Sequence, residues 1–383
     1  MNSKERVSAA LKREPVDKVP LGLYIVDHDI ISKVIGRPTY VRNKPAMQVA
    51  LWEGRRDEIV ESMKRDIIDF YKKIDCVDIL TFKEARQMPP RGYKAENPPE
   101  KIDEFTYKDK NGIWRLEPEY NDIMFFPDKQ ESELKEYSVE QFADRSGKNS
   151  QDPSCFELCD SLIENFGKEY YIAGDCGGIT ALTLLGGTEN GLMTMALQPE
   201  VVKACNEQQV YFQNINDQYY IRKGVDGVQF GQDMAGTNGP LVSPEMFREL
   251  CFPYLKRRIE NIKRYVPHVI LHNCGNNLPI MDMLAAAGID GYESIQTNSE
   301  MSIKKIAELY GDQLCIWGAV SLEILIAGSP ADVRRDVQRC FEEAKTAKGF
   351  ILGPSHSIAF GTKYENFMAM LDEYVRLCDR RQF

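Results

Sequence analysis

The chain has 383 residues, of which 43% are hydrophobic and 28% are charged, a composition typical of a globular protein that buries a substantial core. Its formal net charge of -10 argues against a general affinity for nucleic acids or anionic membranes, because both require a concentrated basic surface. The sequence contains no apolar core of a signal peptide and no run long enough to cross a bilayer, so we expect a cytoplasmic protein.

An amphipathic helix is predicted for residues 1–18. Val7, Ala10 and Leu11 fall on one face of this helix at helical spacing. Because the helix precedes the first predicted strand, we expect it to cover the bottom of a barrel.

Eight short runs rich in aliphatic and aromatic residues follow, each succeeded by a polar turn and a segment of helical periodicity. Nearly continuous apolar runs are typical of parallel strands that helices cover. Their alternation with helices predicts an α/β fold, a single (β/α)8 TIM barrel over residues 1–383. The runs are Val19–Ile25, Val77–Phe82, Tyr170–Asp175, Gly227–Asp233, Val269–Cys274, Gly291–Ile295, Leu314–Ala319 and Phe350–Gly353.

A long insertion, residues 83–169, interrupts the alternation after the second run. It is rich in Pro, Lys and Glu, and it places Asn111-Gly112 between Tyr107 and Trp114, a strong signal for a β-hairpin. We interpret the insertion as a cap beside the mouth of the barrel and not as a second domain.

The fifth run ends with His272 and Cys274. Residues i and i+2 of a strand point to the same side, so the imidazole and the thiolate are predicted to face one another at the end of the strand. Imidazole and thiolate together favour zinc, and a catalytic zinc takes about three protein ligands. A His and a Cys two residues apart are more often packing residues, but their place at the catalytic end of the barrel favours a metal site.

The third ligand is expected from the end of another strand. His356, after the eighth run, is the candidate, and Cys176, after the third run, is the alternative. The choice between them stays open at this point.

Further polar residues lie at the same predicted rim. Asp233 and Glu293 are candidate catalytic residues that would orient a metal-bound histidine or carry a proton, and they are equally compatible with a loop carboxylate or a helix cap. Asp27 and His28 follow the first run, where we expect them to face the substrate and cofactor unless they form an ordinary polar turn.

Several segments resemble the uroporphyrinogen decarboxylase superfamily. They are Lys4–Val7, Glu14–Pro20, Gly239–Pro244 and Gly349–Leu352, and the similarity extends over nearly the whole chain. The resemblance implies a TIM barrel, and it is less specific for a reaction, because the superfamily includes both decarboxylases and cobalamin-dependent methyltransferases similar to the methylcobamide:coenzyme M enzymes.

The two branches differ at positions that can be read in this sequence. Decarboxylases of the superfamily carry an arginine-rich stretch after the first Val-Pro motif, whereas Leu21–Asp27 contains no arginine and adds an acid. The methyltransferase branch carries His-x-Cys on the fifth strand as zinc ligands, which His272 and Cys274 match. Its third ligand is usually a cysteine in the coenzyme M enzymes, and His356 stands at the equivalent place here, so the resemblance implies zinc but puts thiol methylation in doubt.

The resemblance therefore implies a methyltransferase that moves a methyl group between a small methylated substrate, a methoxy or thiol compound, and a corrinoid. The sequence lacks an Asp-x-His-x-x-Gly corrinoid-binding motif, so we expect the cobalamin on a separate corrinoid protein that docks over the mouth near residues 83–169. The alternatives are a metal-free decarboxylase-like lyase acting on a tetrapyrrole and a noncatalytic ligand-binding barrel. The resemblance is compatible with a monomer or a homodimer.

Overall fold

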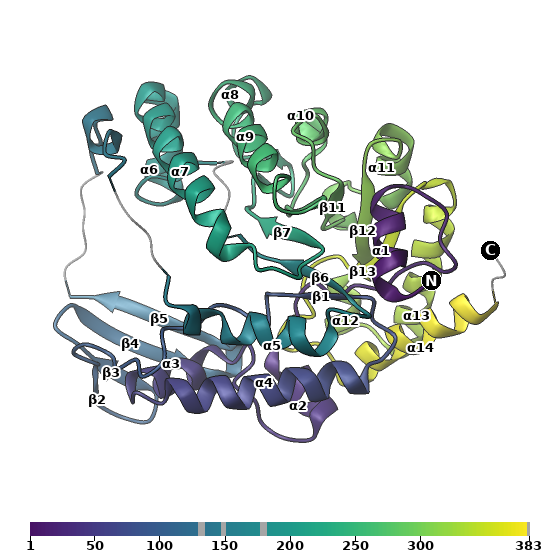
Figure 1. The fold of residues 1–383 in the computed structure, drawn as a ribbon, viewed down its shortest axis with the longest axis horizontal. Helices are drawn as coiled ribbons and strands as arrows, with labels where there is room; N and C mark the ends of the chain where they lie inside the picture. The colour runs from purple at the N-terminus through teal and green to yellow at the C-terminus, as the bar shows by residue number, and fades with distance from the viewer. Residues whose placement is uncertain (129–134, 147–150, 177–181, 381–383) are drawn as a thin grey trace.

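A curved sheet of seven parallel strands forms the centre of the protein (Figure 1). The computed structural model describes residues 1–128, 135–146, 151–176 and 182–380. Neighbouring strands follow one another in chain order except where the inserted strands intervene, as expected for a barrel. The strands in sheet order are β1 (Ile79–Thr81), β6 (Tyr171–Gly174), β7 (Gly227–Gly231), β10 (His268–His272), β11 (Gly291–Glu293), β12 (Cys315–Val320) and β13 (Phe350–Pro354).

Residues 21–22 close this sheet into a ring. Leu21 forms a parallel bridge to Leu352 on β13, and Gly22 forms one to Ile79 on β1. These two residues therefore occupy the place of an eighth strand, and the predicted (β/α)8 barrel is confirmed. The predicted extent of the first strand, Val19–Ile25, is wrong, because Tyr24 has a φ of 63°, which an extended strand does not accommodate.

The closure requires a glycine at position 22. A Cβ atom there would lie 2.4 Å from the ring of Trp317, and the indole N–H of Trp317 donates a hydrogen bond to the carbonyl of Gly22 at 3.1 Å. The short first strand is thus held against a side chain from the interior of the barrel.

Helices cover the outside of the ring, and capping side chains set where several of them begin. Ser243 accepts a hydrogen bond from the Met246 N–H, and Ser329 accepts one from the Asp332 N–H. Among the described residues the α-helices are α1 (Ser3–Leu11), α2 (His28–Ile35), α3 (Lys44–Trp52), α4 (Arg56–Lys73), α5 (Glu157–Phe166), α6 (Thr188–Leu197), α7 (Pro199–Tyr220), α8 (Pro244–Leu250), α9 (Phe252–Ile262), α10 (Met281–Ala286), α11 (Ile303–Tyr310), α12 (Leu322–Ala327), α13 (Pro330–Glu343) and α14 (Tyr364–Arg380). Short 3-10 helices are η1 (Pro118–Tyr120), η2 (Val139–Phe142), η3 (Pro153–Phe156), η4 (Leu278–Ile280), η5 (Thr297–Ser299) and η6 (Ala344–Thr346).

No helix in the described part of the chain has both the length and the apolar composition of a membrane span.

Helix α1 covers the end of the barrel at which the strands begin. As predicted, Val7, Ala10 and Leu11 are buried, and they belong to one apolar cluster with interior residues of the barrel such as Ile270 and Trp317. The helix spans Ser3–Leu11, within the segment predicted from the sequence. The bottom of the barrel is therefore closed, which leaves the opposite end for ligands.

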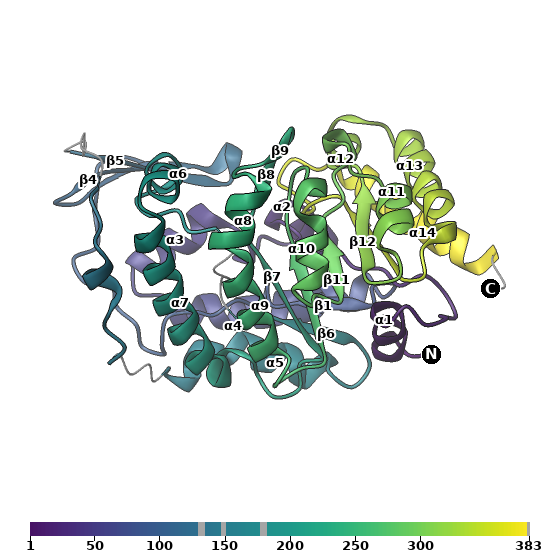
Figure 2. The same ribbon diagram turned by 90° about the horizontal axis from the view of Figure 1, so that it is seen from above.

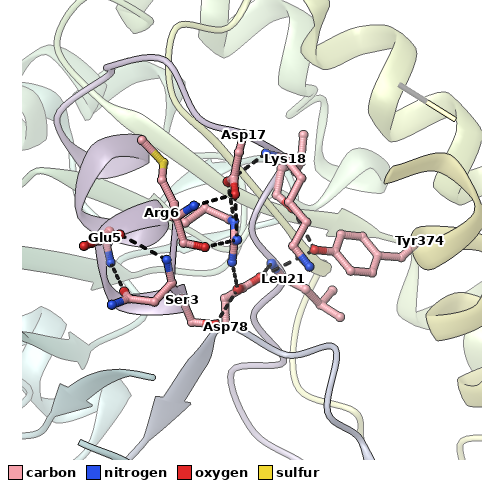
Figure 3. A network of polar contacts seen from close by, with 11 residues as sticks. Ser3, Glu5, Arg6, Asp17, Lys18, Leu21, Asp78 and Tyr374 are labelled. Carbon is pink, nitrogen blue, oxygen red and sulfur yellow. Dashed lines mark hydrogen bonds and ion pairs between the residues drawn. The ribbon is translucent and has the colours of Figure 1, made fainter. Parts of the chain in front are cut away.

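A polar network fixes the N-terminal segment to the start of β1 (Figure 3). Arg6 donates hydrogen bonds to Asp17 at 2.7 Å and to Asp78 at 2.5 Å, and Asp78 also accepts the Leu21 N–H at 2.9 Å. The hydrogen bond from Arg6 is the largest cause that lowers the pKa of Asp17 below its usual value. Asp78 directly precedes β1 and binds the Leu21 N–H. The network therefore joins α1 to β1 and to the short segment at Leu21 that closes the barrel.

The insertion after β1 contains an antiparallel sheet. The second and third strands of this four-stranded sheet, β3 (Thr106–Lys108) and β4 (Gly112–Glu117), form the predicted hairpin, in which Tyr107 pairs with Trp114. Trp52 at the end of α3 packs on both rings, with centroid distances of 4.9 and 5.8 Å. In Figure 2, this sheet and the small β8–β9 hairpin lie at the end opposite α1, where the barrel strands finish. The remaining strands are β2 (Glu100–Lys101), β3 (Thr106–Lys108), β4 (Gly112–Glu117), β5 (Asp122–Pro127), β8 (Ala235–Gly236) and β9 (Gly239–Pro240).

Candidate metal centre

The turn after β10 carries the predicted pair of ligands. His272 is the last residue of the strand, and Cys274 lies in the turn beyond it, so the expectation that both belong to the strand is wrong. Gly275 has a φ of +80°, and a Cβ atom there would lie 2.6 Å from the Ala235 carbonyl oxygen. This glycine lets the turn fold back close to the neighbouring loop and bring Cys274 toward His272.

His272, Cys274 and His356 lie together at the mouth of the barrel. One ligand atom from each residue lies within 4.8 Å of the other two. His272 Nε2 is 3.3 Å from Cys274 Sγ. Zinc bonds of about 2.0 to 2.3 Å in tetrahedral geometry place such a nitrogen and sulfur about 3.5 Å apart. The separation of the two atoms and the identities of the three donors therefore fit zinc.

Glu293 determines which nitrogen of His272 faces the cysteine. The carboxylate of Glu293 is buried and hydrogen-bonds to His272 Nδ1, which leaves Nε2 directed toward Cys274. Burial lowers the pKa of His272, but the charge of Glu293 and the hydrogen bonds at both nitrogens raise it to about 10. A carboxylate on the outer nitrogen of a histidine ligand is the usual means of fixing its ring at a metal site.

His356 approaches from the loop that follows β13. Its Nδ1 is 2.9 Å from the Ser357 hydroxyl, so Nε2 remains available as a ligand. Burial, followed by the charge of His272, lowers the pKa of His356 below its usual value. The neutral ring is the form that binds a metal, so a metal ion would have to displace the proton of His272 but would meet His356 already neutral.

Tyr24 completes the wall of the site, and no sequence pattern indicated its role. Its ring stacks on His272 with a centroid distance of 4.2 Å and an interplanar angle of 13°. It also meets the ring of His356 edge-on at 6.4 Å. The left-handed backbone at Tyr24, with its φ of 63°, turns this side chain into the barrel, and a sequence pattern does not reveal such a conformation.

The two predicted carboxylates have different positions. Glu293 is fully buried beneath His272, whereas the Asp233 side chain is 59% exposed and lies 4.0 Å from His272 Nε2. Asp233 accepts a hydrogen bond from the Cys274 backbone N–H at 3.0 Å. Glu293 therefore orients the ring of His272, and Asp233 orients the backbone of Cys274.

Cys176, the alternative third ligand, is outside this group. It is buried, with its sulfur 3.5 Å from Arg258 Nη2, and it does not belong to the cluster of three ligand atoms. The structure therefore brings His356 to the centre in preference to Cys176.

Asp27 and His28 form the start of α2. Asp27 accepts a hydrogen bond from Arg42 at 3.1 Å and another from the Phe360 N–H at 3.0 Å. The ring of His28 stacks on Phe360 with a centroid distance of 5.3 Å. These contacts fasten the loop after β13, which carries His356, to the first helix of the barrel. Contact of Asp27 and His28 with a corrinoid stays a prediction.

Comparison with known proteins places the chain in a family. The profile of uroporphyrinogen decarboxylase (URO-D) matches residues 125–376, more than half of the chain. The chain belongs to the uroporphyrinogen decarboxylase family. This URO-D domain includes the strands that carry His272, Glu293 and the loop of His356.

Two solved structures were compared with the URO-D chain, and the first of them shares its fold. A methyltransferase from Methanosarcina mazei superposes with a TM-score of 0.62 at 19% identity, covering 98% of this chain and 99% of that one. A protein from Listeria monocytogenes described as a vitamin-B12-independent methionine synthase has a TM-score of 0.44 at 12% identity, with 95% and 96% covered. No curated protein sequence matches the chain.

Proposed function

We propose that the protein is a zinc-dependent methyltransferase that moves a methyl group between a small methylated substrate and the corrinoid of a partner protein. The observation that carries this proposal is the cluster of His272, Cys274 and His356, with Glu293 fixing the first of them. The shared fold with a methyltransferase from Methanosarcina mazei supports the reaction class at the level of the fold. The barrel end opposite α1 is also where enzymes of this architecture place their reactive groups.

The protein residues have distinct tasks in this proposal. A bound zinc ion would supply Lewis acidity at a methoxy oxygen, or lower the pKa of a substrate thiol. Glu293 holds the His272 ring so that Nε2 points to the shared site, and Asp233 holds the Cys274 backbone. Tyr24 covers one face of His272 and keeps water from it.

The ligand set favours one direction of transfer. Two neutral imidazoles and one thiolate leave a divalent ion with a net positive charge, whereas a second thiolate would neutralise it. A site with net positive charge polarises a leaving group more strongly. We therefore favour demethylation of a small methylated donor, with cobalt on the partner protein as the acceptor.

Methyl transfer to cobalamin tests the function. We would mix zinc-loaded protein with free cob(I)alamin and with methoxyarenes or methyl thioethers, and follow the change in absorbance as methylcobalamin forms. Transfer should occur with the parent, and Cys274→Ala should lose it. Cys378→Ala, which removes a cysteine from α14, is the matched control and should retain it.

Two results would reject the proposal. The first is equal methyl transfer by the parent and Cys274→Ala. The second is release of carbon dioxide from uroporphyrinogen by metal-free protein, which would favour the decarboxylase reaction for which the family is named.

A further inference from the structure

A cavity of about 250 Å³ opens at the ends of β1 and β6. Phe82 directly follows β1, and Asp175 directly follows β6, so the cavity is on the side of the barrel where the strands finish. The walls combine two aromatic rings with polar groups and one guanidinium. The lining residues are Phe82, Arg86, Gln87, Cys159, Asp175 and Tyr220.

Arg86 has no hydrogen bond or ion pair with any residue in the described part of the chain. The other cation at this rim, Lys83, is paired with Asp175 at 2.7 Å. Burial, followed by the charge of Arg42, lowers the pKa of Arg86 below its usual value. A guanidinium that is subject to the charge of a second one gains stability from an anion that binds beside it.

Arg42 is held in place but is not neutralised completely. Its Nε donates to Asp27, while its two terminal nitrogens make no hydrogen bond among the described residues. The backbone at Arg42 has a φ of 61°, and its carbonyl accepts a hydrogen bond from the Asn121 side chain at 2.9 Å. The insertion thus fixes the backbone at Arg42, whereas the Arg86 side chain is exposed at the surface.

The cavity and the candidate metal centre lie at the same end of the barrel. Phe82 and Asp175 directly follow β1 and β6, and Cys274 and His356 lie just beyond the ends of β10 and β13. In parallel strands these ends all meet on one side of the sheet.

We propose that this cavity binds the carboxylate end of a small, flat, apolar substrate, with Arg86 on the carboxylate and Phe82 and Tyr220 against the apolar body. One guanidinium in the wall fits a single negative charge, and the Asp175 carboxylate in the same wall disfavours a dianion such as phosphate. The identification of this ligand as the methylated substrate rests on the proposed function. The anion-binding site itself does not.

Calorimetric titration of the zinc-loaded full chain with benzoate tests the proposal. A charge-assisted hydrogen bond is lost when Arg86 becomes Met, which we expect to weaken benzoate binding by about 10-fold to 100-fold. Benzamide, the neutral counterpart, and acetate, which lacks the ring, should each bind the parent at least about 10-fold more weakly than benzoate. Arg115→Met, on a side chain that is 64% exposed in the antiparallel sheet, is the matched control and should bind benzoate as the parent does.

Three results would overturn the proposal: equal affinity for benzoate and benzamide, equal affinity for benzoate and acetate, or unchanged benzoate binding by Arg86→Met. Circular dichroism of each variant identifies any loss of binding that is caused by unfolding. The same titration with metal-free protein separates this site from the proposed function, because benzoate should still bind through Arg86 if the chain holds no zinc. Conversely, zinc binding without benzoate binding would overturn only the anion site.

Discussion

The buried carboxylate of Glu293 hydrogen-bonds to His272 Nδ1, and this contact turns the opposite nitrogen of the ring toward Cys274. The second oxygen of Glu293 has no hydrogen-bond partner among the described residues. A buried carboxylate is costly unless a charge or hydrogen bond compensates it, so its place beneath a histidine ligand requires a functional reason.

The first prediction concerns this contact. Glu293→Gln should weaken zinc binding by about 10-fold, at the lower end of the range for residues that hold a metal ligand, because the amide still accepts a hydrogen bond but carries no charge. Glu293→Ala should weaken it more. Competition with a chromophoric chelator measures both affinities, and a Glu293→Ala variant that binds zinc as tightly as the parent would show that the carboxylate does not support the ligand.

The second prediction concerns Tyr24. Tyr24→Leu removes the stacked ring from His272 and should weaken zinc binding by roughly 2-fold to 10-fold, which corresponds to the usual energy of an aromatic pair. Tyr24→Phe retains the ring and should bind zinc as the parent does. If both variants lose affinity equally, the hydroxyl group and not the stacking would be responsible.

The sequence predicted those residues of the candidate site that lie at or just beyond the ends of strands. His272, Cys274 and His356 could be predicted together because parallel strands deliver their last residues to one end of a barrel, and the structure brings their ligand atoms within 4.8 Å. The predicted strand position of Cys274 was wrong, since the turn at Gly275 and not the alternation of a strand carries it to His272.

Other features depend on tertiary contacts that a sequence pattern does not contain. The left-handed backbone that turns Tyr24 into the barrel also ends the first strand after only two bridges. The antiparallel sheet was visible in the sequence only as the hairpin at Asn111-Gly112. Arg86 makes no hydrogen bond or ion pair within the described part of the chain, which becomes apparent only when its neighbours are known.

The third prediction concerns the N-terminal network. Arg6→Met leaves the buried Asp78 without its cation and should lower the free energy of unfolding by about 3 kcal/mol, as expected when one partner of a buried ion pair is removed. The control is Lys345→Met, which breaks an exposed ion pair with Glu342. This variant should change the free energy of unfolding by less than about 1 kcal/mol. Chemical denaturation measures both changes. Equal effects would mean that the Arg6 network does not hold α1 to the barrel.

The fourth prediction concerns pH. Burial raises the pKa of Glu84 to about 7, although hydrogen bonds such as that from the Val26 N–H oppose this rise. In the unfolded chain the same group titrates near 4.5, so folding favours the protonated form. The stabilisation from Glu84 is therefore complete below pH 4.5 and is lost as the pH rises through 7.

Glu84→Gln should remove this dependence. Between pH 4.5 and 7.5, the parent should lose about 3 kcal/mol of unfolding free energy relative to the variant, on the order expected from the difference between the two pKa values. Denaturation curves at several pH values give the comparison. Parallel pH profiles for the two proteins would show that Glu84 titrates normally in the folded state.

Zinc content is the most direct test of the candidate centre. Elemental analysis of tag-free protein purified without chelator should find about one zinc ion per chain in the parent, and His272→Ala, Cys274→Ala and His356→Ala should each lose most of it. Cys176→Ala should retain the metal, because Cys176 lies outside the cluster of ligand atoms. Parent protein that contains no zinc and takes none up when zinc is added would contradict the account.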